Sequence, residues 1–305
     1  MNLLVTGAWQ QAKEYIQKIE KQGHQVMFLQ FEKDELPCDY GWVEGIIGNG
    51  IFLSHPIEKF VNLKYIQLTS AGFDRVPMNN VKERGIVINN ARGVYSTPMA
   101  EYAMAGVLAL YKCQKFFAEN QKACKWEKKR DLRELAGQKV CILGCGSVGT
   151  ECARRFAAMD CVVHGIDKYT REDSNYACIH HLEDAKTVIA DSDIVVVTLP
   201  LTDETMHMFN REMFAVMKSA SVLVNIARGA LIETDALIEA LETKLNGAVL
   251  DVFEEEPLNE NSPLWDMENV VITPHNSFVS DGNAKRLSKV IMENLLNNKL
   301  GERKK

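Results

Sequence analysis

Four short segments in the second half of the chain carry side chains that could take part in a single reaction. The glycine-rich run at 144–149, GCGSVG, is suited to holding a pyrophosphate group. Arg228 could clamp a carboxylate, and His275 could act as the acid and base of the reaction, with Glu256 as the carboxylate that tunes it. Hydride transfer between a nicotinamide and a 2-oxo acid needs this whole set, and few other reactions do. The sequence therefore predicts an oxidoreductase reaction of this kind.

The context of the glycine-rich run decides its interpretation, because a lone Gly-x-Gly-x-x-Gly pattern also occurs in ordinary tight turns. Here an apolar stretch at 140–143 leads into Gly144, and a stretch of helical composition follows at 147–158. We expect Gly144 to permit the turn, Gly146 to let the pyrophosphate approach closely, and Gly149 to bring the helix against the strand. The helix N-terminus would then face the anion.

Asp167 follows the next predicted strand, 18 residues after Gly149, where an acid that binds the adenosine ribose is expected. Its carboxylate could accept both ribose hydroxyls and would repel a 2'-phosphate, so NAD is preferred over NADP. Lys168 and Arg171 lie close by in the sequence and keep NADP open. Surface charge is their alternative role.

Two further loops follow predicted strands and could reach the same edge of the sheet. The loop that begins at Thr198 and contains Pro200 could border the nicotinamide, although an ordinary strand-ending turn is the simpler interpretation. Arg228 lies just beyond a predicted strand at 222–225. Its planar guanidinium matches a carboxylate in a bidentate pair and could polarise the adjacent ketone, whereas a surface ion pair is the alternative.

His275 follows the predicted strand at 270–273 and could donate the proton that a ketone needs when it accepts hydride. Glu256 is the candidate carboxylate beside the ring, where a hydrogen bond would favour the protonated form. The alternative for the acidic run at 254–256 is a loop in water, and at least two of its three carboxylates are expected to be solvated. Asp251 could face the nicotinamide or cap a turn.

The composition is that of a globular protein and narrows the choice of partners. Apolar residues make up 46% of the 305 residues, and the net charge of -6 argues against nucleic acid as a partner. No window resembles a membrane span or a signal peptide, so we expect a cytoplasmic protein whose eight cysteines are reduced. No Cys-x-x-Cys pair occurs and the pair His180-His181 lacks a ligand-spaced partner, so no metal site is expected.

Short β-rich runs alternate with helical patterns from end to end, which predicts an α/β fold of two doubly wound parallel-sheet domains. We expect a substrate domain at 1–93 and 278–305, an NAD-binding domain at 94–277, and a cleft between them. The expected strands lie at 3–6, 25–29, 45–47, 65–68 and 86–88, and then at 138–143, 162–166, 194–198, 222–225, 248–250 and 270–273.

One predicted helix has an unusually apolar surface. It is expected to run from Met99 to about Phe117, capped by Thr97 and with Pro98 at its first position. Its character indicates either core packing or an interface between subunits or domains. A last amphipathic stretch at 282–297 is expected to pack on the first domain.

Beyond these separate signals, the chain resembles the D-isomer-specific 2-hydroxyacid dehydrogenase family along nearly its whole length. The similar segments are TSAGFD at 69–74, MAEY at 99–102, Trp126, ELAG at 134–137, the glycine-rich run, PLT at 200–202, NIARG at 225–229, DVFEEEP at 251–257 and TPH at 273–275. The resemblance implies a flavodoxin-like substrate domain, a Rossmann domain that binds NAD, a small 2-oxo or 2-hydroxy acid as substrate, and a homodimer formed through the NAD-binding domain.

The resemblance also implies roles for individual residues. Arg228, Glu256 and His275 would be catalytic, and the backbone N–H groups of Ala71 and Gly72 would hold the substrate carboxylate, with Arg228 and His275 also touching the substrate. The residues that would bind NAD are Gly144, Gly146, Ser147, Val148, Gly149, Asp167, Thr198, Pro200, Thr205, Ala227 and Asp251.

The chain departs from the family directly after His275, where Asn276-Ser277-Phe278 replaces the usual small or apolar residues. Aromatic residues in four loops could line the substrate pocket and favour an apolar side chain on the substrate, although core packing is the alternative for each. They are Trp9, Phe52, Tyr95 and Phe278.

Two other functions remain compatible with the sequence. Relatives with this fold act as corepressors, so an NAD(H)-sensing regulatory protein is the main alternative. A formate dehydrogenase of the same superfamily ranks last, because those enzymes have glutamine where Glu256 stands.

Overall fold

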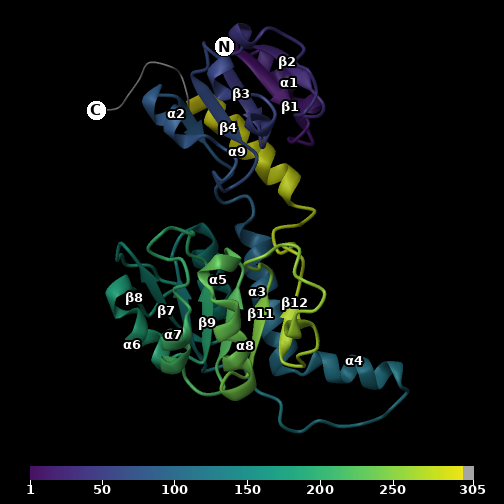
Figure 1. The fold of residues 1–305 in the computed structure, drawn as a ribbon, viewed down its shortest axis with the longest axis vertical. Coiled ribbons are helices and arrows are strands. Elements are labelled where there is room, and N and C mark those ends of the chain that lie inside the picture. Colours follow the sequence, from purple (N-terminus) through teal and green to yellow (C-terminus); the bar gives the residue numbers. More distant parts are fainter. Residues whose placement is uncertain (298–305) are drawn as a thin grey trace. The chain divides into compact units, whose positions relative to one another are not determined.

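The computed structural model describes residues 1–297, and the chain forms two compact units (Figure 1). Within the described residues, the smaller unit comprises Met1–Tyr95 and the chain from Ser280 to Asn297, and the larger unit comprises Ser96–Val279. The chain therefore passes from one unit to the other twice.

The smaller unit is built on a parallel sheet in the order β2-β1-β3-β4-β5, the strand order of flavodoxin-like folds. Its strands are β1 (Asn2–Thr6), β2 (Gln25–Leu29), β3 (Gly45–Gly48), β4 (Tyr65–Leu68) and β5 (Val87–Asn89). Strands β3 and β4 are buried along their whole length, so both faces of the sheet need cover. Apolar side chains of α1 (Ala12–Glu20) and α9 (Asn283–Asn297) cover one face, and those of α2 (Met78–Glu83) pack on the other.

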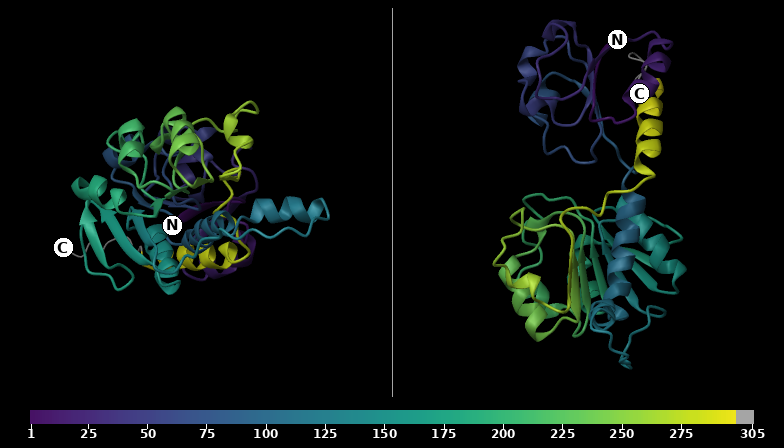
Figure 2. Two further views of the ribbon diagram at one scale, coloured as in Figure 1. Left: turned by 90° about the horizontal axis from the view of Figure 1, so that it is seen from below. Right: turned by 90° about the vertical axis from the view of Figure 1, so that its right-hand side faces the viewer.

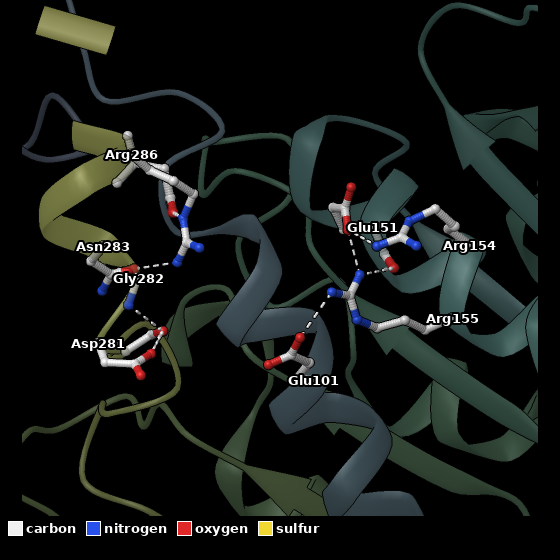
Figure 3. Close-up of polar contacts among 10 residues, drawn as sticks. Glu101, Glu151, Arg154, Arg155, Asp281, Gly282, Asn283 and Arg286 are labelled. Carbon is white, nitrogen blue, oxygen red and sulfur yellow. Dashed lines mark hydrogen bonds and ion pairs between the residues drawn. The ribbon is translucent and has the colours of Figure 1, made fainter. Parts of the chain in front are cut away.

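The last helix, α9, is held to the smaller unit by polar contacts as well as by apolar packing. Trp9 is 1% exposed and donates through Nε1 to Ser288 Oγ at 2.9 Å. Near the start of α9, Arg286 donates through Nε to the Val94 carbonyl at 2.7 Å and through Nη2 to Asn283 Oδ1 at 2.8 Å (Figure 3). Arg286 thus joins the two segments at which the chain leaves and re-enters this unit.

The larger unit is built on a parallel sheet in the order β12-β11-β10-β9-β6-β7-β8. Its strands are β6 (Lys139–Leu143), β7 (Val162–Asp167), β8 (Cys178–His181), β9 (Ile194–Val197), β10 (Val222–Asn225), β11 (Gly247–Leu250) and β12 (Val270–Ile272). Helices α3 (Ser96–Tyr111) and α5 (Ser147–Ala158) cover one face, and α6 (Ala185–Ala190), α7 (Arg211–Val216) and α8 (Thr234–Thr243) cover the other (Figure 2).

Short 3-10 helices connect several of these elements. They are η1 (Tyr40–Trp42), η2 (Ile51–Leu53) and η3 (Ile57–Lys59) in the smaller unit, and η4 (Leu182–Asp184), η5 (Gly229–Leu231) and η6 (Pro263–Trp265) in the larger one. Of these, η5 directly follows Arg228 and therefore bears on the position of its side chain.

Helix α3 is apolar because it packs on both α5 and the sheet. Gly106 permits this close approach, since a Cβ atom at that position would lie 2.4 Å from Val249 Cγ1 on β11. An ion pair also joins the two helices, since Arg155 of α5 donates to Glu101 of α3 at 3.1 Å (Figure 3). Arg155 pairs in addition with Glu151 of its own helix. The apolar surface of α3 is therefore explained by packing inside the larger unit.

The predicted α/β fold with two doubly wound sheets is confirmed, and the predicted strands agree with the observed ones to within one residue at each end. The predicted apolar helix is wrong at both ends. It begins at Ser96, so Thr97 is a helical residue and not the cap, and it ends at Tyr111. Cys113, with φ of 48°, separates it from α4 (Gln114–Lys122).

The sequence does not predict β8, because this short edge strand carries two histidines in place of an apolar run. The predicted amphipathic stretch at the end of the chain corresponds to α9, which packs on the smaller unit. Within residues 1–297, no helix combines the length and the apolar character that a membrane crossing requires.

The contact at Gly106 generates a stability prediction. In Gly106→Ala, overlap with Val249 should outweigh the better helix propensity of alanine, and the free energy of unfolding should fall by about 1–2 kcal/mol. Urea denaturation measures the change. Gly41→Ala is the control, because a Cβ atom there would meet its nearest neighbour at 3.8 Å. Equal stability of the two variants would contradict the close packing of α3 on β11.

Candidate active site

The glycine-rich run has a different geometric constraint at each of its glycines. Gly144 has φ of 95°, and a Cβ atom there would lie 2.9 Å from the backbone of Thr198. A Cβ atom at Gly149 would lie only 1.9 Å from the Gly144 carbonyl oxygen, so this glycine lets α5 approach the strand. Gly146 has open space around it, and α5 begins directly after it with Ser147 and Val148. Open space beside a helix N-terminus suits a pyrophosphate.

Asp167 ends β7 and is hydrogen-bonded to the glycine-rich run. Its Oδ2 accepts the Cys145 N–H at 2.7 Å, and its Oδ1 accepts the Tyr169 N–H at 3.3 Å. Arg171 donates to the carbonyl of the same Cys145 at 2.5 Å and to Thr150 Oγ1 at 3.2 Å. A carboxylate and a guanidinium therefore hold the two sides of Cys145, and Arg171 is more than the surface charge that the sequence allows.

The Cys145 side chain is buried under this loop. Burial raises the pKa of its thiol to about 11, so the thiol stays protonated and is no nucleophile. The eight cysteines all lie in the described part of the chain, and all are unpaired.

The loop after β9 is held together by its own threonines. Thr198 Oγ1 donates to the Gly144 carbonyl at 2.6 Å, which joins this loop to the glycine-rich run. The hydroxyl of Thr205 is buried, donates to the Pro200 carbonyl at 2.8 Å and accepts the Thr202 N–H at 2.8 Å. Both hydroxyls are used to shape the loop, whereas Pro200 is exposed.

His275 and Glu256 form a hydrogen-bonded pair. The distance from His275 Nδ1 to Glu256 Oε2 is 2.9 Å, and Glu256 Oε1 accepts the Phe253 N–H at 3.1 Å. The imidazole is 45% exposed, and its Nδ1 contact orients the ring and leaves Nε2 as the second site for a proton. The two loops that follow β11 and β12 thus meet at this pair.

Asp251 fixes the backbone around His275. It is 0% exposed, and its carboxylate accepts from Thr273 Oγ1 at 2.5 Å and from the N–H groups of Asn276 and Ser277 at 2.7 and 3.0 Å. His275 has φ of 49°, an uncommon value for a residue other than glycine, and its own N–H donates to the Asp251 carbonyl at 2.7 Å. These contacts show the turn cap that the sequence allows for Asp251.

Tyr102 extends this network to α3. Thr273 Oγ1 lies 2.6 Å from the Tyr102 hydroxyl, and burial raises the pKa of Tyr102, with the Asp251 charge acting in the same direction. The neutral phenol of Tyr102 therefore contacts the Thr273 hydroxyl, and this contact ties the loop that carries His275 to α3.

Arg228 lies in the loop after β10, which the buried Asn225 holds at both ends. Asn225 Oδ1 accepts the Ala227 N–H at 3.1 Å, and its Nδ2 donates to the Arg228 carbonyl at 3.0 Å. The half-buried guanidinium of Arg228 donates through Nη1 to the Ala227 carbonyl at 2.7 Å. A Cβ atom at Gly229 would lie 1.8 Å from the Phe253 carbonyl carbon, so the Arg228 loop rests directly on the loop that carries Glu256.

Glu254 is a residue for which the sequence suggests no role. Its carboxylate contacts His207 Nε2 at 2.7 Å and accepts both the N–H and the hydroxyl of Thr234. Burial by itself would raise the pKa of Glu254, but the hydrogen bonds from Thr234 and His207 outweigh it and hold the pKa below its ordinary value. All three residues of the acidic run are exposed, as expected, but Glu254 and Glu256 also have hydrogen-bond partners.

In the smaller unit, the loop after β4 has two backbone N–H groups that are available to a ligand. Asn90 Nδ2 donates to the Ala71 carbonyl at 2.5 Å, and Ser70 Oγ donates to the Gly72 carbonyl at 3.0 Å. These contacts hold the carbonyl side of the loop. Within residues 1–297 the N–H groups of Ala71 and Gly72 have no acceptor, which suits them to an anion.

Four aromatic residues are expected at the substrate pocket. The expectation is wrong for Trp9, which is a core residue hydrogen-bonded to Ser288 of α9. Tyr95 donates through its hydroxyl to the Thr69 carbonyl, and Phe52 packs edge to face on Phe60. Phe278 is 40% exposed and packs edge to face on His275, with ring centroids 6.1 Å apart. It is therefore the aromatic residue that directly contacts the proposed acid.

Within the described residues, no cluster of three or more His, Cys, Asp or Glu side chains could hold a metal ion. His180 contacts another histidine, His164, at 3.1 Å between its Nε2 and the His164 Nδ1.

Comparison with known proteins agrees with this geometry. Residues 104–277 match the family described as D-isomer specific 2-hydroxyacid dehydrogenase, NAD binding domain. A glyoxylate reductase of Thermofilum pendens is 34% identical over 247 residues, which are 77% of this chain and 71% of that protein. A D-3-phosphoglycerate dehydrogenase of Archaeoglobus fulgidus is 33% identical over 79% of this chain, but the match spans only 46% of that protein.

A solved structure shares the fold over almost the whole chain. It is a D-isomer specific 2-hydroxyacid dehydrogenase from Xanthobacter autotrophicus in complex with NADPH and MES, with a TM-score of 0.79 and 28% identity. The likeness covers 99% of this chain and 96% of that one.

Proposed function

Because the chain belongs to the D-isomer-specific 2-hydroxyacid dehydrogenase family, we propose that it interconverts 2-oxo acids and D-2-hydroxy acids with NAD as the hydride carrier. The observation that carries the proposal is the His275–Glu256 pair, at 2.9 Å, on the same sheet edge as the glycine-rich run. A proton donor and a dinucleotide site at one sheet edge are what a carbonyl reductase requires.

Each residue of the proposed mechanism has one task. In the direction of reduction, His275 Nε2 gives a proton to the carbonyl oxygen, and Glu256 holds the ring from the Nδ1 side. Arg228 pairs with the substrate carboxylate, and the N–H groups of Ala71 and Gly72 are proposed as carboxylate donors in the smaller unit. Bound NADH supplies the hydride.

The cofactor would be held mainly by the glycine-rich run. Gly144, Gly146 and Gly149 shape the loop, Ser147 and Val148 offer the helix N-terminus to the pyrophosphate, and Asp167 binds the ribose hydroxyls. Repulsion between Asp167 and a 2'-phosphate favours NAD over NADP. Pro200 and Ala227 would border the nicotinamide, while Thr198, Thr205 and Asp251 shape the loops around it.

A homodimer formed through the larger unit is part of the proposal. Helix α4 and the extended segment after it project from the sheet and its helices (Figure 1). Trp126 in this segment is 97% exposed, and a hollow of about 820 Å³ lies beside it, lined among others by Phe117 and Asn120. An indole ring with almost no contact in its own chain is typical of a surface that another subunit covers.

The free thiols of the eight cysteines fit a reducing, cytoplasmic compartment.

Replacement of His275 tests the proposed reaction. His275→Ala should lower the rate of 2-oxo acid reduction by about 100- to 10,000-fold, because the proton donor is lost, while NADH binding is kept. The substrates are glyoxylate, pyruvate, hydroxypyruvate, phenylpyruvate, 2-oxoisocaproate and phosphohydroxypyruvate, with NADH loss as the measurement. The control is His181→Ala at the exposed end of β8.

A fully active His275→Ala protein would contradict the assignment of the proton donor. A wild-type protein that binds NADH and reduces no member of the panel would favour the alternative, an NAD(H)-sensing regulatory protein.

Replacement of Trp126 tests the dimer. Trp126→Glu should convert a dimer into a monomer in sedimentation experiments, because a charge in a covered apolar surface is costly. Leu53→Glu is the control, since Leu53 is also an exposed apolar residue, at 72%, but lies in the smaller unit. A monomeric wild-type protein, or a dimer that tolerates the charge, would contradict this part of the proposal.

A further inference from the structure

Glu254 joins three loops of the larger unit that carry residues of the proposed site. These are the loop after β9, which contains His207, the loop after β10, which contains Arg228, and its own loop after β11. Resting on the function proposed above, we propose that Glu254 and His207 form a positioning pair that sets the geometry of Arg228 and Glu256. Neither side chain touches the reacting atoms in this role.

The first contact anchors Glu254 to the rigid part of the fold. One carboxylate oxygen, Oε2, accepts the Thr234 N–H at 2.7 Å and also the Thr234 hydroxyl. Thr234 is the first residue of α8, which is packed on the sheet through buried residues such as Leu237 and Leu241. The positive end of the helix dipole and an otherwise unsatisfied N–H group favour a carboxylate at this place.

The second contact joins Glu254 to the loop after β9, beside which the cofactor is proposed to bind. The other carboxylate oxygen, Oε1, lies 2.7 Å from His207 Nε2. His207 has φ of 50°, and its N–H donates to the Ala230 carbonyl at 2.8 Å. Its backbone is therefore held by the Arg228 loop while its side chain is held by Glu254, so the three loops have a common junction.

The third contact transmits this position to Arg228. The Phe253–Glu254 backbone lies so close to Gly229 that a Cβ atom there would be 1.8 Å from the Phe253 carbonyl carbon and 2.4 Å from the Glu254 nitrogen. Neither backbone can shift toward the other. Since Gly229 is bonded to Arg228, a displacement of the Glu254 backbone moves the origin of the arginine side chain.

A fourth contact transmits it to the acid–base pair. The Phe253 N–H donates to Glu256 Oε1 at 3.1 Å, and Glu256 Oε2 contacts His275 at 2.9 Å. The position of the Glu256 carboxylate thus depends on the backbone that Glu254 holds. The Glu254 carboxylate is only 30% exposed, and its lowered pKa keeps it charged at neutral pH, as a strong acceptor must be.

The acidic run itself offers a matched control. Glu255 is the direct neighbour of Glu254, is exposed, and has no hydrogen bond or ion pair within residues 1–297. Glu254→Ala and Glu255→Ala therefore remove the same charge from the same loop, and they differ in whether the junction with Thr234 and His207 is broken.

We expect Glu254→Ala to lower kcat/KM for the best 2-oxo acid by about 10- to 100-fold, because small misplacements of reacting groups have effects of this size. Glu255→Ala should keep the wild-type value. NADH titration should still give full binding stoichiometry in both variants, which separates misplacement from partial unfolding. Glu254→Gln should recover part of the activity, since its amide oxygen can still accept from Thr234.

The role of His207 is tested by a double-mutant cycle. His207→Ala alone should lower kcat/KM in the same direction, and adding it to Glu254→Ala should lower kcat/KM no further, because both changes break one junction. Equal activity of Glu254→Ala and Glu255→Ala would overturn the inference, and so would fully additive losses. If the wild-type protein reduces no 2-oxo acid at all, the proposed function fails, and this role fails with it.

Discussion

The larger unit depends on one geometric constraint: its strands all run parallel, so every loop that follows a strand begins at the same edge of the sheet. At the centre of the sheet, neighbouring strands end opposite one another: Asn225 at the end of β10 lies opposite Val197 of β9 and Leu250 of β11. The loops that contain Pro200, Arg228 and Glu256 therefore start side by side. Residues that are far apart in the sequence become neighbours without any special long connection.

A shared edge brings the loops together, and buried polar groups give each loop its shape. Asn225 binds both ends of the Arg228 loop, Thr198 binds the glycine-rich run, and Asp251 binds the backbone that follows His275. The carboxylate of Asp251 is completely buried and yet has three donors around it, one hydroxyl and two backbone N–H groups, so its burial is compensated. The side chains proposed for chemistry are the more exposed ones, and the supporting side chains lie beneath them.

The sequence predicts the parts of this arrangement that local physics determines. Buried parallel strands appear as short apolar runs, and the glycine pattern follows from a positive φ at Gly144 and the close approach at Gly149. It does not predict the break at Cys113, because a left-handed φ at a residue other than glycine depends on its surroundings. It also does not predict the partners of Glu254, since Thr234 and His207 lie 20 and 47 residues away in the sequence.

The central claim is that this sheet edge delivers a hydride to one face of a 2-oxo acid. Incubation with each of the two NADH forms that carry deuterium on one side of nicotinamide C4 tests it most directly, with chiral separation and mass spectrometry of the product. Membership of the D-isomer-specific family predicts that one form yields a D-2-hydroxy acid with a single deuterium at C2, and that the other yields the unlabelled D-acid. An L-acid, a racemic mixture, or a product without deuterium from both forms would contradict the account.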